Sequence, residues 1–357
     1  MSIPSRNEAA AAGIEIVGNG VRFSVYGYRF VLQGDCSFAL EGLTEDFAFF
    51  ADKSPAQNPK RGEVRLELMQ GAPDYDGLPV VDASIYTPRN VVYRHHGVRI
   101  LDFGGRGLGT YDGNNRLFRI TSEDPYLVYE AAYLFLLSQI GQECDRRGMH
   151  RLHALAMSYK GHAILALMPM GGGKSTLGSA LLRGSGLSIL SDDSPFIDRE
   201  GNAHAFPLRL GLLKGREGEV PEEHRRLVHR MEFGPKYLVN YSYFAGRVVD
   251  RAKPGIVLLG RRTLARQGRL TEASYLTAMK AMTPNMIVGL GLFQGLEYLL
   301  ERSTSEIAGK AGLGLSRLRN AHTLVRASRN FVFHMGRDPD INAQSVVDLA
   351  ERLFGKD

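Results

Sequence analysis

The chain has 357 residues and a net charge of +6, and 44% of its residues are hydrophobic and 23% charged. This composition is that of an ordinary water-soluble protein, and the length allows two domains or one large domain with an elaborated end. No apolar run reaches the ~18 residues that a membrane-spanning helix needs, so no membrane partner is expected. The basic residues form no long run or aromatic-interleaved stripe, so the charge gives no support for a nucleic-acid partner.

The two cysteines, Cys36 and Cys144, lie far apart in the sequence and have no metal-ligand spacing. We expect them to be inert buried thiols of a cytoplasmic protein. The first residues lack a basic stretch followed by an apolar core, so no signal peptide is expected. A cytoplasmic location would also supply ATP.

Residues 1–125 are predicted to form an N-terminal β-rich region. Strand-like patterns cover Gly13–Leu32, Val64–Leu68 and Asn90–Phe103. Asn19-Gly20 stands where the first of these would need a hairpin turn. The glycine-rich stretch Phe103–Arg116 is expected to be a loop, since its Gly-x-Gly-x-Gly spacing leads into further turn residues and not into a helix.

Residues 126–357 are predicted to form a second, catalytic domain. The spacing of apolar residues indicates a helix over Pro125–Arg147. Two strands, a glycine loop, a helix and another strand follow: Leu152–Ser158, Ala163–Met168, Pro169–Lys174, Ser175–Arg183 and Leu187–Leu190. A further buried strand is expected at Ile256–Leu259, and a helical extension from about residue 271, with Phe331–Ala343 as a connector between helices. The fold class is therefore α/β, with a mixed sheet and flanking helices.

The segment Met168–Thr176 (MPMGGGKST) lies between an apolar strand and a helix and has the features of a phosphate-binding P-loop, or Walker A motif. Glycines can turn backbone N–H groups toward a phosphate, and the start of the helix adds its own N–H groups and dipole. In the standard motif the lysine reaches the β- and γ-phosphates and the next hydroxyl ligates Mg²⁺. Met168 replaces the first glycine of the full pattern, and Pro169 lacks an N–H donor. The expected nucleotide-binding residues are Gly171, Gly172, Gly173, Lys174, Ser175 and Thr176.

Two adjacent carboxylates, Asp192 and Asp193, follow an apolar strand directly. Strand ends in α/β proteins place side chains beside a phosphate-binding loop. One carboxylate can then hold Mg²⁺, while the other takes the proton of an attacking hydroxyl.

Other polar residues are weaker candidates. His150 is expected to be a solvated turn residue and His162 a structural residue in a turn, whereas His153 is a candidate for the active site. Arg209 is either a phosphate clamp or an ordinary surface charge. Three further basic residues are weaker candidates for a phosphate clamp: Lys214, Arg261 and Arg262.

The block from His153 to Asp193 resembles the catalytic domain of HPr kinase/phosphorylase and its wider kinase relatives. In that family the active-site histidine stands fifteen residues before the first position of the P-loop, which is the separation of His153 and Met168 here. Phosphoenolpyruvate carboxykinases share the layout more remotely. The resemblance covers roughly Tyr129–Leu259. It implies that His153 lies near the transferred phosphate, that Asp192 is the general base, and that Asp193 and Ser175 surround the metal.

The sequence therefore predicts an ATP- and Mg²⁺-dependent kinase, with Lys174, His153 and Asp192 as catalytic residues and Arg209 near a phosphate. The Arg-Gly-rich second signature of true HPr kinases is not visible, so the acceptor is expected to be another hydroxyl, on a peptide, a protein or a small molecule. Two alternatives stay open: a catalytically decayed nucleotide-binding regulator or peptide-presenting module, and a P-loop nucleotide hydrolase. Relatives form rings or dimers, so homo-oligomerisation is open too.

Overall fold

The computed structural model describes residues 15–17, 20–51, 63–169, 171–184, 186–212, 215, 218, 220–230, 234–287 and 305–355. The protein is α/β: of the residues that the structure describes, 35% are in helices and 36% in strands of mixed sheets. It divides into two compact units, whose boundary falls after Ile140, inside helix α4 (Pro125–Arg146). Unit 1 also includes Leu227–Lys236, and unit 2 holds nearly all of the remaining chain. Within the described part of the chain, no helix is long and apolar enough to cross a membrane.

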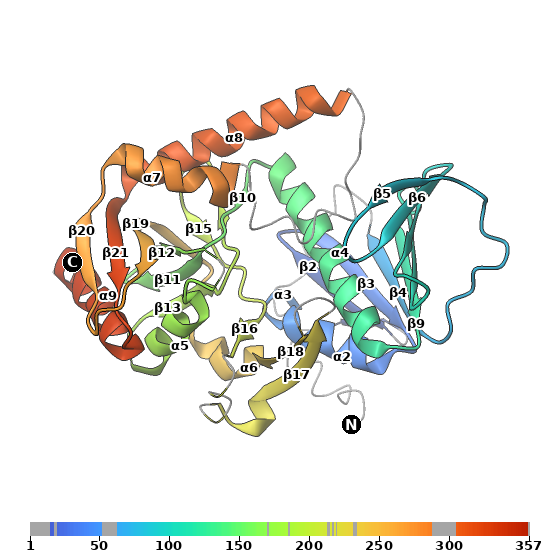
Figure 1. Cartoon of the computed structure of the whole chain (residues 1–357), viewed down its shortest axis with the longest axis horizontal. Coiled ribbons are helices and arrows are strands. Elements are labelled where there is room, and N and C mark those ends of the chain that lie inside the picture. The colour runs from blue at the N-terminus through green and yellow to red at the C-terminus, as the bar shows by residue number, and fades with distance from the viewer. Residues whose placement is uncertain are drawn as a thin grey trace. The chain divides into compact units, whose positions relative to one another are not determined.

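Unit 1 is built on one nine-stranded sheet (Figure 1). Its strands are β1 (Glu15–Val17), β2 (Gly20–Val25), β3 (Tyr28–Gly34), β4 (Val64–Gln70), β5 (Ala83–Tyr86), β6 (Val91–His95), β7 (Val98–Asp102), β8 (Leu108–Asp112) and β9 (Leu117–Ser122). Their order is β1-β2-β3-β4-β9-β8-β7-β6-β5. Neighbours are antiparallel except at β4, which is parallel to both β3 and β9.

Strands β1 to β4, β6 and β7 fall on the expected patterns, whereas β5, β8 and β9 lie outside them. Strands β1 and β2 pair antiparallel with Val17 opposite Gly20, so Gly20 belongs to a strand; Asn19 lies outside the described residues. The stretch Phe103–Arg116, expected as a loop, contains strand β8, which was a wrong prediction. Here pairing with β7 and β9 outweighs the poor strand preference of glycine, because Gly109 lets its strand approach Leu101 closely.

Helices α2 (Ser37–Asp46) and α3 (Ala48–Ala51) follow β3, and the first part of α4 packs on the sheet. The rings of Phe118 on β9 and Phe135 on α4 stack with their centroids 4.1 Å apart. The hydroxyl of Tyr129 donates a buried hydrogen bond of 2.7 Å to Asp46. Aromatic packing of this kind fixes α4 against the sheet that precedes it.

Unit 2 has its own nine-stranded sheet. The strands are β10 (His150–Arg151), β11 (Leu155–Tyr159), β12 (His162–Leu167), β13 (Ser188–Ser191), β14 (Phe196–Ile197), β15 (Ala203–His204), β19 (Arg251–Arg262), β20 (Arg269–Glu272) and β21 (Arg329–Met335). The order is β10-β14-β15-β19-β12-β11-β13, with β21 pairing to β19 and to β20. Strand β19 is parallel to both β12 and β21. A separate small sheet has the order β16-β18-β17: Leu210–Gly211, Gly234–Val239 and Arg225–Arg230.

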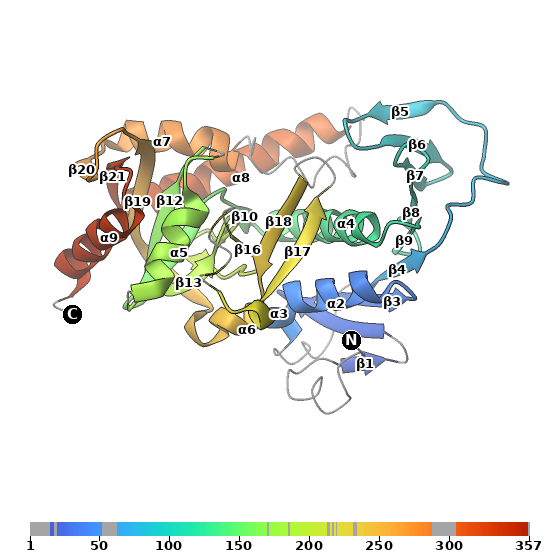
Figure 2. The ribbon, with the colours of Figure 1, turned by 60° about the horizontal axis from the view of Figure 1, so that its bottom comes forward.

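Helices cover both faces of this second large sheet. They are α5 (Lys174–Gly184), α6 (Tyr241–Phe244), α7 (Tyr275–Met282), α8 (Ser305–Ala327) and α9 (Pro339–Phe354), with short turns η2 (Glu222–His224), η3 (Ala245–Arg247) and the π-helical η4 (Thr283–Ile287). Helices α5 and α9 lie on one side and α7 and α8 on the other (Figures 1 and 2). Alternate residues of the strands, such as Ile164, Ala166, Ile256 and Leu258, face the core shared with α5 and α9.

The structure corrects one part of the C-terminal prediction. Residues Phe331–Met335 belong to strand β21, which lies between β19 and β20 in the sheet, and are not a connector between helices. The elements around the glycine loop, in contrast, follow the predicted order of strand, turn, strand, loop, helix and strand. The turn between β11 and β12 has Lys160 and Gly161 at φ of 46° and 77°, as a tight hairpin requires.

Candidate functional site

The glycine loop joins the carboxyl end of β12 to the start of α5. Gly171 and Gly173 have φ of 71° and 102°, a region that only glycine enters without strain. The N–H of Gly172 donates to the carbonyl of Pro169 at 2.8 Å, and a Cβ on Gly172 would lie 2.7 Å from that oxygen. The backbone of this turn therefore requires glycine at each of the three positions. Met170 lies outside the described residues.

Helix α5 begins directly after this turn. The N–H of Leu177, in the first turn of the helix, donates a hydrogen bond of 2.9 Å to the carbonyl of Gly173. The N–H groups of the first helical turn have no partner within a helix, and they carry the positive end of its dipole. The loop and the helix start thus form the kind of backbone arrangement that binds anions.

Lys174, the first residue of α5, is buried, with 8% of its surface exposed. Its ammonium lies 2.7 Å from Nε2 of His153 and donates to the carbonyl of Met168 at 3.0 Å. It also lies 3.6 Å from Oδ1 of Asp193. A buried ammonium held by three polar groups has a fixed position at the mouth of the loop.

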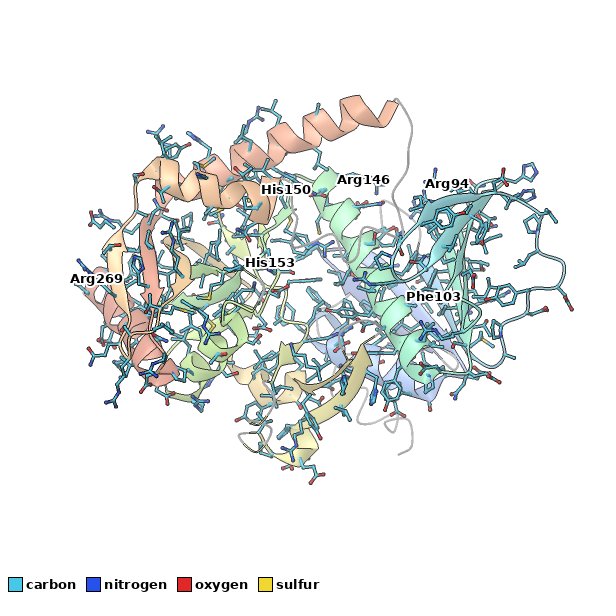
Figure 3. The ribbon with its side chains drawn as sticks, viewed as in Figure 1. Arg94, Phe103, Arg146, His150, His153 and Arg269 are labelled. Atoms are coloured by element: carbon cyan, nitrogen blue, oxygen red, sulfur yellow. The ribbon has the colours of Figure 1, made fainter. Side chains whose placement is uncertain are left out.

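His153 links the lysine to one of the aspartates. Its Nδ1 lies 3.2 Å from Oδ1 of Asp193, while its Nε2 faces the Lys174 ammonium. Because an ammonium can only donate, Nε2 must accept, and the imidazole proton then sits on Nδ1, toward the carboxylate. The structure therefore brings together three of the predicted site residues in one chain of contacts, and Figure 3 labels His153 among the side chains of unit 2.

Asp193 has a lowered pKa. Burial around the carboxyl group raises the pKa, but the hydrogen bond and charge of His153 and the charge of Lys174 more than offset it. The side chain is still 52% exposed, so one edge of the carboxylate faces solvent. We expect Asp193 to be ionised at neutral pH and accessible to a molecule that approaches from solvent.

Asp192 contacts a different neighbour. The hydroxyl of Ser175 lies 3.5 Å from its Oδ2. Its Oδ1 lies close to Gly178, one turn further along α5, where a Cβ would stand 3.7 Å away. The aspartate that lies beside Ser175 is thus Asp192, whereas the family resemblance implied Asp193 at that position.

The remaining predicted residues surround this centre less closely. Thr176 lines a small pocket of about 50 Å³ beside the loop. Arg209 directly precedes β16, three residues after Phe206, whose carbonyl accepts a hydrogen bond from Ser191 at the end of β13. Lys214 lies outside the described residues.

Met168 occupies the position of the missing first glycine. Its side chain is buried and packs against Gly260 on the neighbouring strand β19, where a Cβ would stand 2.6 Å from the methionine Cγ. The methionine is therefore a core residue under the loop, and it points away from the amide groups that the loop presents. The replacement changes the sheet packing and leaves the backbone turn at Gly171–Gly173 in place.

Sequence reasoning undervalued some residues that the fold brings near the loop. The small pocket beside Thr176 is also lined by Arg262 and Arg337. Arg262 ends β19, which is parallel to β12, so the two strands end at the same edge of the sheet. The sequence alone does not show that β19 pairs with β12, and without that pairing Arg262 could not be placed beside the loop.

Two of the histidine expectations have different outcomes. His162 is next to the β11–β12 turn and stacks on Phe354 with ring centroids 4.2 Å apart, which supports the structural role expected for it. His150, expected as a solvated turn residue, is fully buried and bonds to Asp145 and Ser316. That prediction was wrong, because the short strand β10 places the residue beneath helix α8.

A scan of the chain against protein-family models finds no match, and a search of curated proteins finds no relative with significant similarity. The functional reading therefore depends on the residues and their geometry.

Proposed function

We propose that this protein is an ATP-dependent kinase, which transfers the terminal phosphoryl group of ATP to a hydroxyl of a peptide, a protein or a small molecule. The observation that carries the proposal is the buried Lys174 ammonium, held at the start of a helix by His153, the loop carbonyl of Met168 and Asp193. A strand, a triple-glycine turn and a helix with such a lysine form the arrangement that phosphate groups require.

The residues of the site would have distinct tasks. Backbone N–H groups of the loop and of the first turn of α5 would bind the phosphate oxygens, and Lys174 would neutralise their charge. To do so its ammonium has to leave the carbonyl of Met168, from which it is 3.0 Å away. His153 can then hold Lys174 and Asp193 in their relative positions, since its two ring nitrogens lie beside these two side chains.

One aspartate would accept the proton of the acceptor hydroxyl while that oxygen bonds to the phosphoryl group, and ADP would leave. Asp193 is ionised and half exposed, which suits this task. Asp192 and Ser175 lie together and would be the protein ligands of Mg²⁺. Bound magnesium would supply charge neutralisation for the phosphate groups. This assignment exchanges the two aspartate roles that the family resemblance implies.

The direct test is incubation with Mg²⁺ and γ-labelled ATP together with serine-containing peptides and small alcohols. We expect label on an acceptor hydroxyl at a rate well above label release to water. Label that leaves ATP only as inorganic phosphate would contradict a kinase and would favour a nucleotide hydrolase. A separate incubation tests the reverse reaction of the family that the sequence resembles. In it, an acceptor that carries the labelled phosphoryl group is mixed with excess phosphate or ADP, and transfer of the label to either one would show the reverse reaction.

Met168 and Pro169 favour a second candidate, a nucleotide-binding regulator without transfer activity. Pro169 offers no N–H group, and the Lys174 ammonium has protein partners already in this structure. Such a protein would bind Mg²⁺–ATP in a calorimetric titration. It would leave the ATP chemically unchanged after hours of incubation with the same peptides and small alcohols. Transfer to any hydroxyl would exclude this alternative.

A further inference from the structure

A second cluster of reactive side chains lies in unit 2, apart from the glycine loop. His150 is fully buried on β10, and its two ring nitrogens have different partners. Nδ1 lies 2.7 Å from Oδ1 of Asp145, and Nε2 lies 2.8 Å from the hydroxyl of Ser316 on α8. Figure 3 labels His150 and Arg146, which lie close to the end of α4. A serine, an imidazole and a carboxylate in this order form the arrangement that activates a serine oxygen.

The carboxylate end of this chain is fixed as an anion. Oδ2 of Asp145 accepts a hydrogen bond of 2.7 Å from Arg317, so both carboxylate oxygens are engaged. Burial raises the pKa of Asp145, but the His150 hydrogen bond and the Arg317 charge hold it below its ordinary value. An ionised Asp145 requires the imidazole proton on Nδ1, which leaves Nε2 as the acceptor for the Ser316 hydroxyl.

The serine also faces open space. Ser316 and Asp145 line a pocket of about 430 Å³, a size that accommodates a small organic molecule. The other lining groups come from the end of α4, the Gly148 turn, the segment after β14 and α8: Gln142, Arg146, Gly148, Arg199, Gly312 and Leu313. The polar chain therefore ends at a residue that lines a cavity.

The charges of the lining indicate the chemical class of the ligand. Arg146 already pairs with Glu143 at 3.2 Å. Arg199 lies across Gly148, where a Cβ would be 2.6 Å from the guanidinium Nε. We therefore assign the recognition of a negative charge to Arg199.

We propose that Ser316 is the nucleophile of a second site, that His150 takes its proton and Asp145 orients the imidazole, and that the site accepts esters with a negatively charged acyl group. Ser316 Oγ would bond to the acyl carbon while the bond to the alcohol oxygen breaks, and the proton would pass through His150 Nε2 to the leaving alcohol. Water, deprotonated by the same nitrogen, would then release the acid and regenerate the serine.

The rates should be modest. In the interior of α8 the backbone N–H groups bond within the helix, so they cannot form an oxyanion site at Ser316. The guanidinium groups at the pocket wall are left to stabilise the negative oxygen. We therefore choose a test that detects a single covalent event and does not depend on fast turnover.

The test uses a fluorophosphonate probe, in which Ser316 Oγ bonds to phosphorus and fluoride leaves. We expect one adduct per folded full-length chain, located on Ser316 by peptide mass mapping, and no adduct with Ser316→Ala. The matched control is Thr323→Ala on the same helix, since the Thr323 hydroxyl donates to the carbonyl of Arg319 within the helix. It should react at the rate of the unchanged protein. Absence of an adduct on Ser316 of the folded, unchanged protein, or an adduct elsewhere, would overturn the proposal without bearing on phosphoryl transfer.

The ligand class has a separate test. The unchanged protein should release p-nitrophenol faster from the p-nitrophenyl half-ester of succinate than from p-nitrophenyl acetate. Arg199→Gln should reduce the ratio of the two rates about tenfold, the equivalent of one charge-assisted hydrogen bond. Equal rates for the two esters, or a preference unchanged by Arg199→Gln, would remove the anionic class from the proposal.

Discussion

At the scale of single residues, Lys174 has more contacts than its place in a sequence motif shows. Its ammonium is buried between an imidazole, a carbonyl and a carboxylate. A charge in such a position is costly unless it is fully paired, so this lysine is held in place before any ligand arrives. Phosphate oxygens would replace the carbonyl of Met168 as its partner.

We expect Lys174→Ala to weaken ATP binding about 10- to 100-fold, because one or two charge-assisted hydrogen bonds to phosphate are lost. Isothermal titration calorimetry measures the change directly. Lys160→Ala is the control, since the Lys160 ammonium donates to the carbonyl of Gly355 and belongs to the hairpin turn. Equal ATP affinity of the Lys174 variant and the unchanged protein would contradict a phosphate role for this side chain.

The roles proposed for the two aspartates can be distinguished by the magnesium dependence of the proposed phosphoryl transfer. Because Asp192 lies beside Ser175, we expect Asp192→Asn to raise the half-saturating Mg²⁺ concentration about tenfold and to recover activity at high Mg²⁺. Asp193→Asn should lower kcat by about 10²- to 10⁴-fold at every Mg²⁺ concentration, as expected for loss of a general base. The opposite pattern would restore the assignment that the family resemblance implies.

At the scale of single residues, the sequence predicted which side chains lie at the candidate site, but not every contact between them. Lys174, His153 and Asp193 were expected at one site and lie together. The assignment of Ser175 to Asp193 and of His150 to solvent depended on the directions of side chains. Those directions follow from strand register and from helix α8, a segment more than a hundred residues away that local patterns could not position.

At the scale of elements, strand β19 has a glycine, Gly260, where the side chain of Met168 packs against it. The side chain enters the sheet core and occupies the space that Gly260 leaves open on β19. A larger residue on one strand therefore requires the smallest residue on its neighbour. The loop remains intact above this pair because its turn depends on Gly171 and Gly173.

This pairing predicts coupled energies. Met168→Ala should lower the free energy of unfolding by about 2–5 kcal/mol through loss of buried volume. Gly260→Ala should lower it by about 1–3 kcal/mol, because its methyl group would overlap the methionine. The double variant should lose less than the sum, since the new methyl enters space that Met168 has left. Urea unfolding measures all four proteins.

The matched control for this cycle is Gly186→Ala, at a position where a Cβ would meet no atom within 4 Å. It should change stability little, alone or combined with Met168→Ala. Additive effects of Met168→Ala and Gly260→Ala would show that the two residues do not share one space.

Among elements, segments with regular apolar spacing were predicted well, and strands that depend on distant pairing were predicted poorly. Helix α4 and the strands on each side of the loop follow their apolar spacing. Strands β8 and β21 were missed, because each is fixed by pairing to strands distant in the sequence. Hydrogen bonding within a sheet can override local propensity, which single-sequence patterns do not record.

At the scale of the whole molecule, partly buried carboxylates with a lowered pKa make stability depend on pH in the acid range. The pKa of Asp198 is lowered: burial raises it, but hydrogen bonds from His204 and Asn202 outweigh burial. A carboxyl group whose pKa is lower in the folded than in the unfolded protein stabilises the fold above the unfolded value. That stabilisation disappears as the pH falls from the ordinary value of 3.8 through the folded pKa.

We therefore expect the stability of the unchanged protein to be flat near pH 6 and to fall steeply below about pH 4. Asp198→Asn should be less stable at pH 6 and should show a shallower decline below pH 4, since this carboxylate no longer takes up a proton on unfolding. Denaturant midpoints across this pH range test the prediction. An unchanged acid slope would mean that Asp198 contributes nothing to it.

The position of β21 has a consequence for how the protein is made. This strand pairs with β19 in the second sheet, yet its residues, Arg329–Met335, leave the ribosome well after those of β19, Arg251–Arg262. Until then β19 lacks one of its parallel neighbours, and the core beneath the glycine loop cannot close. A nascent chain halted before β21 should thus remain sensitive to protease in unit 2, while the nine-stranded sheet of unit 1, complete by residue 122, already resists it.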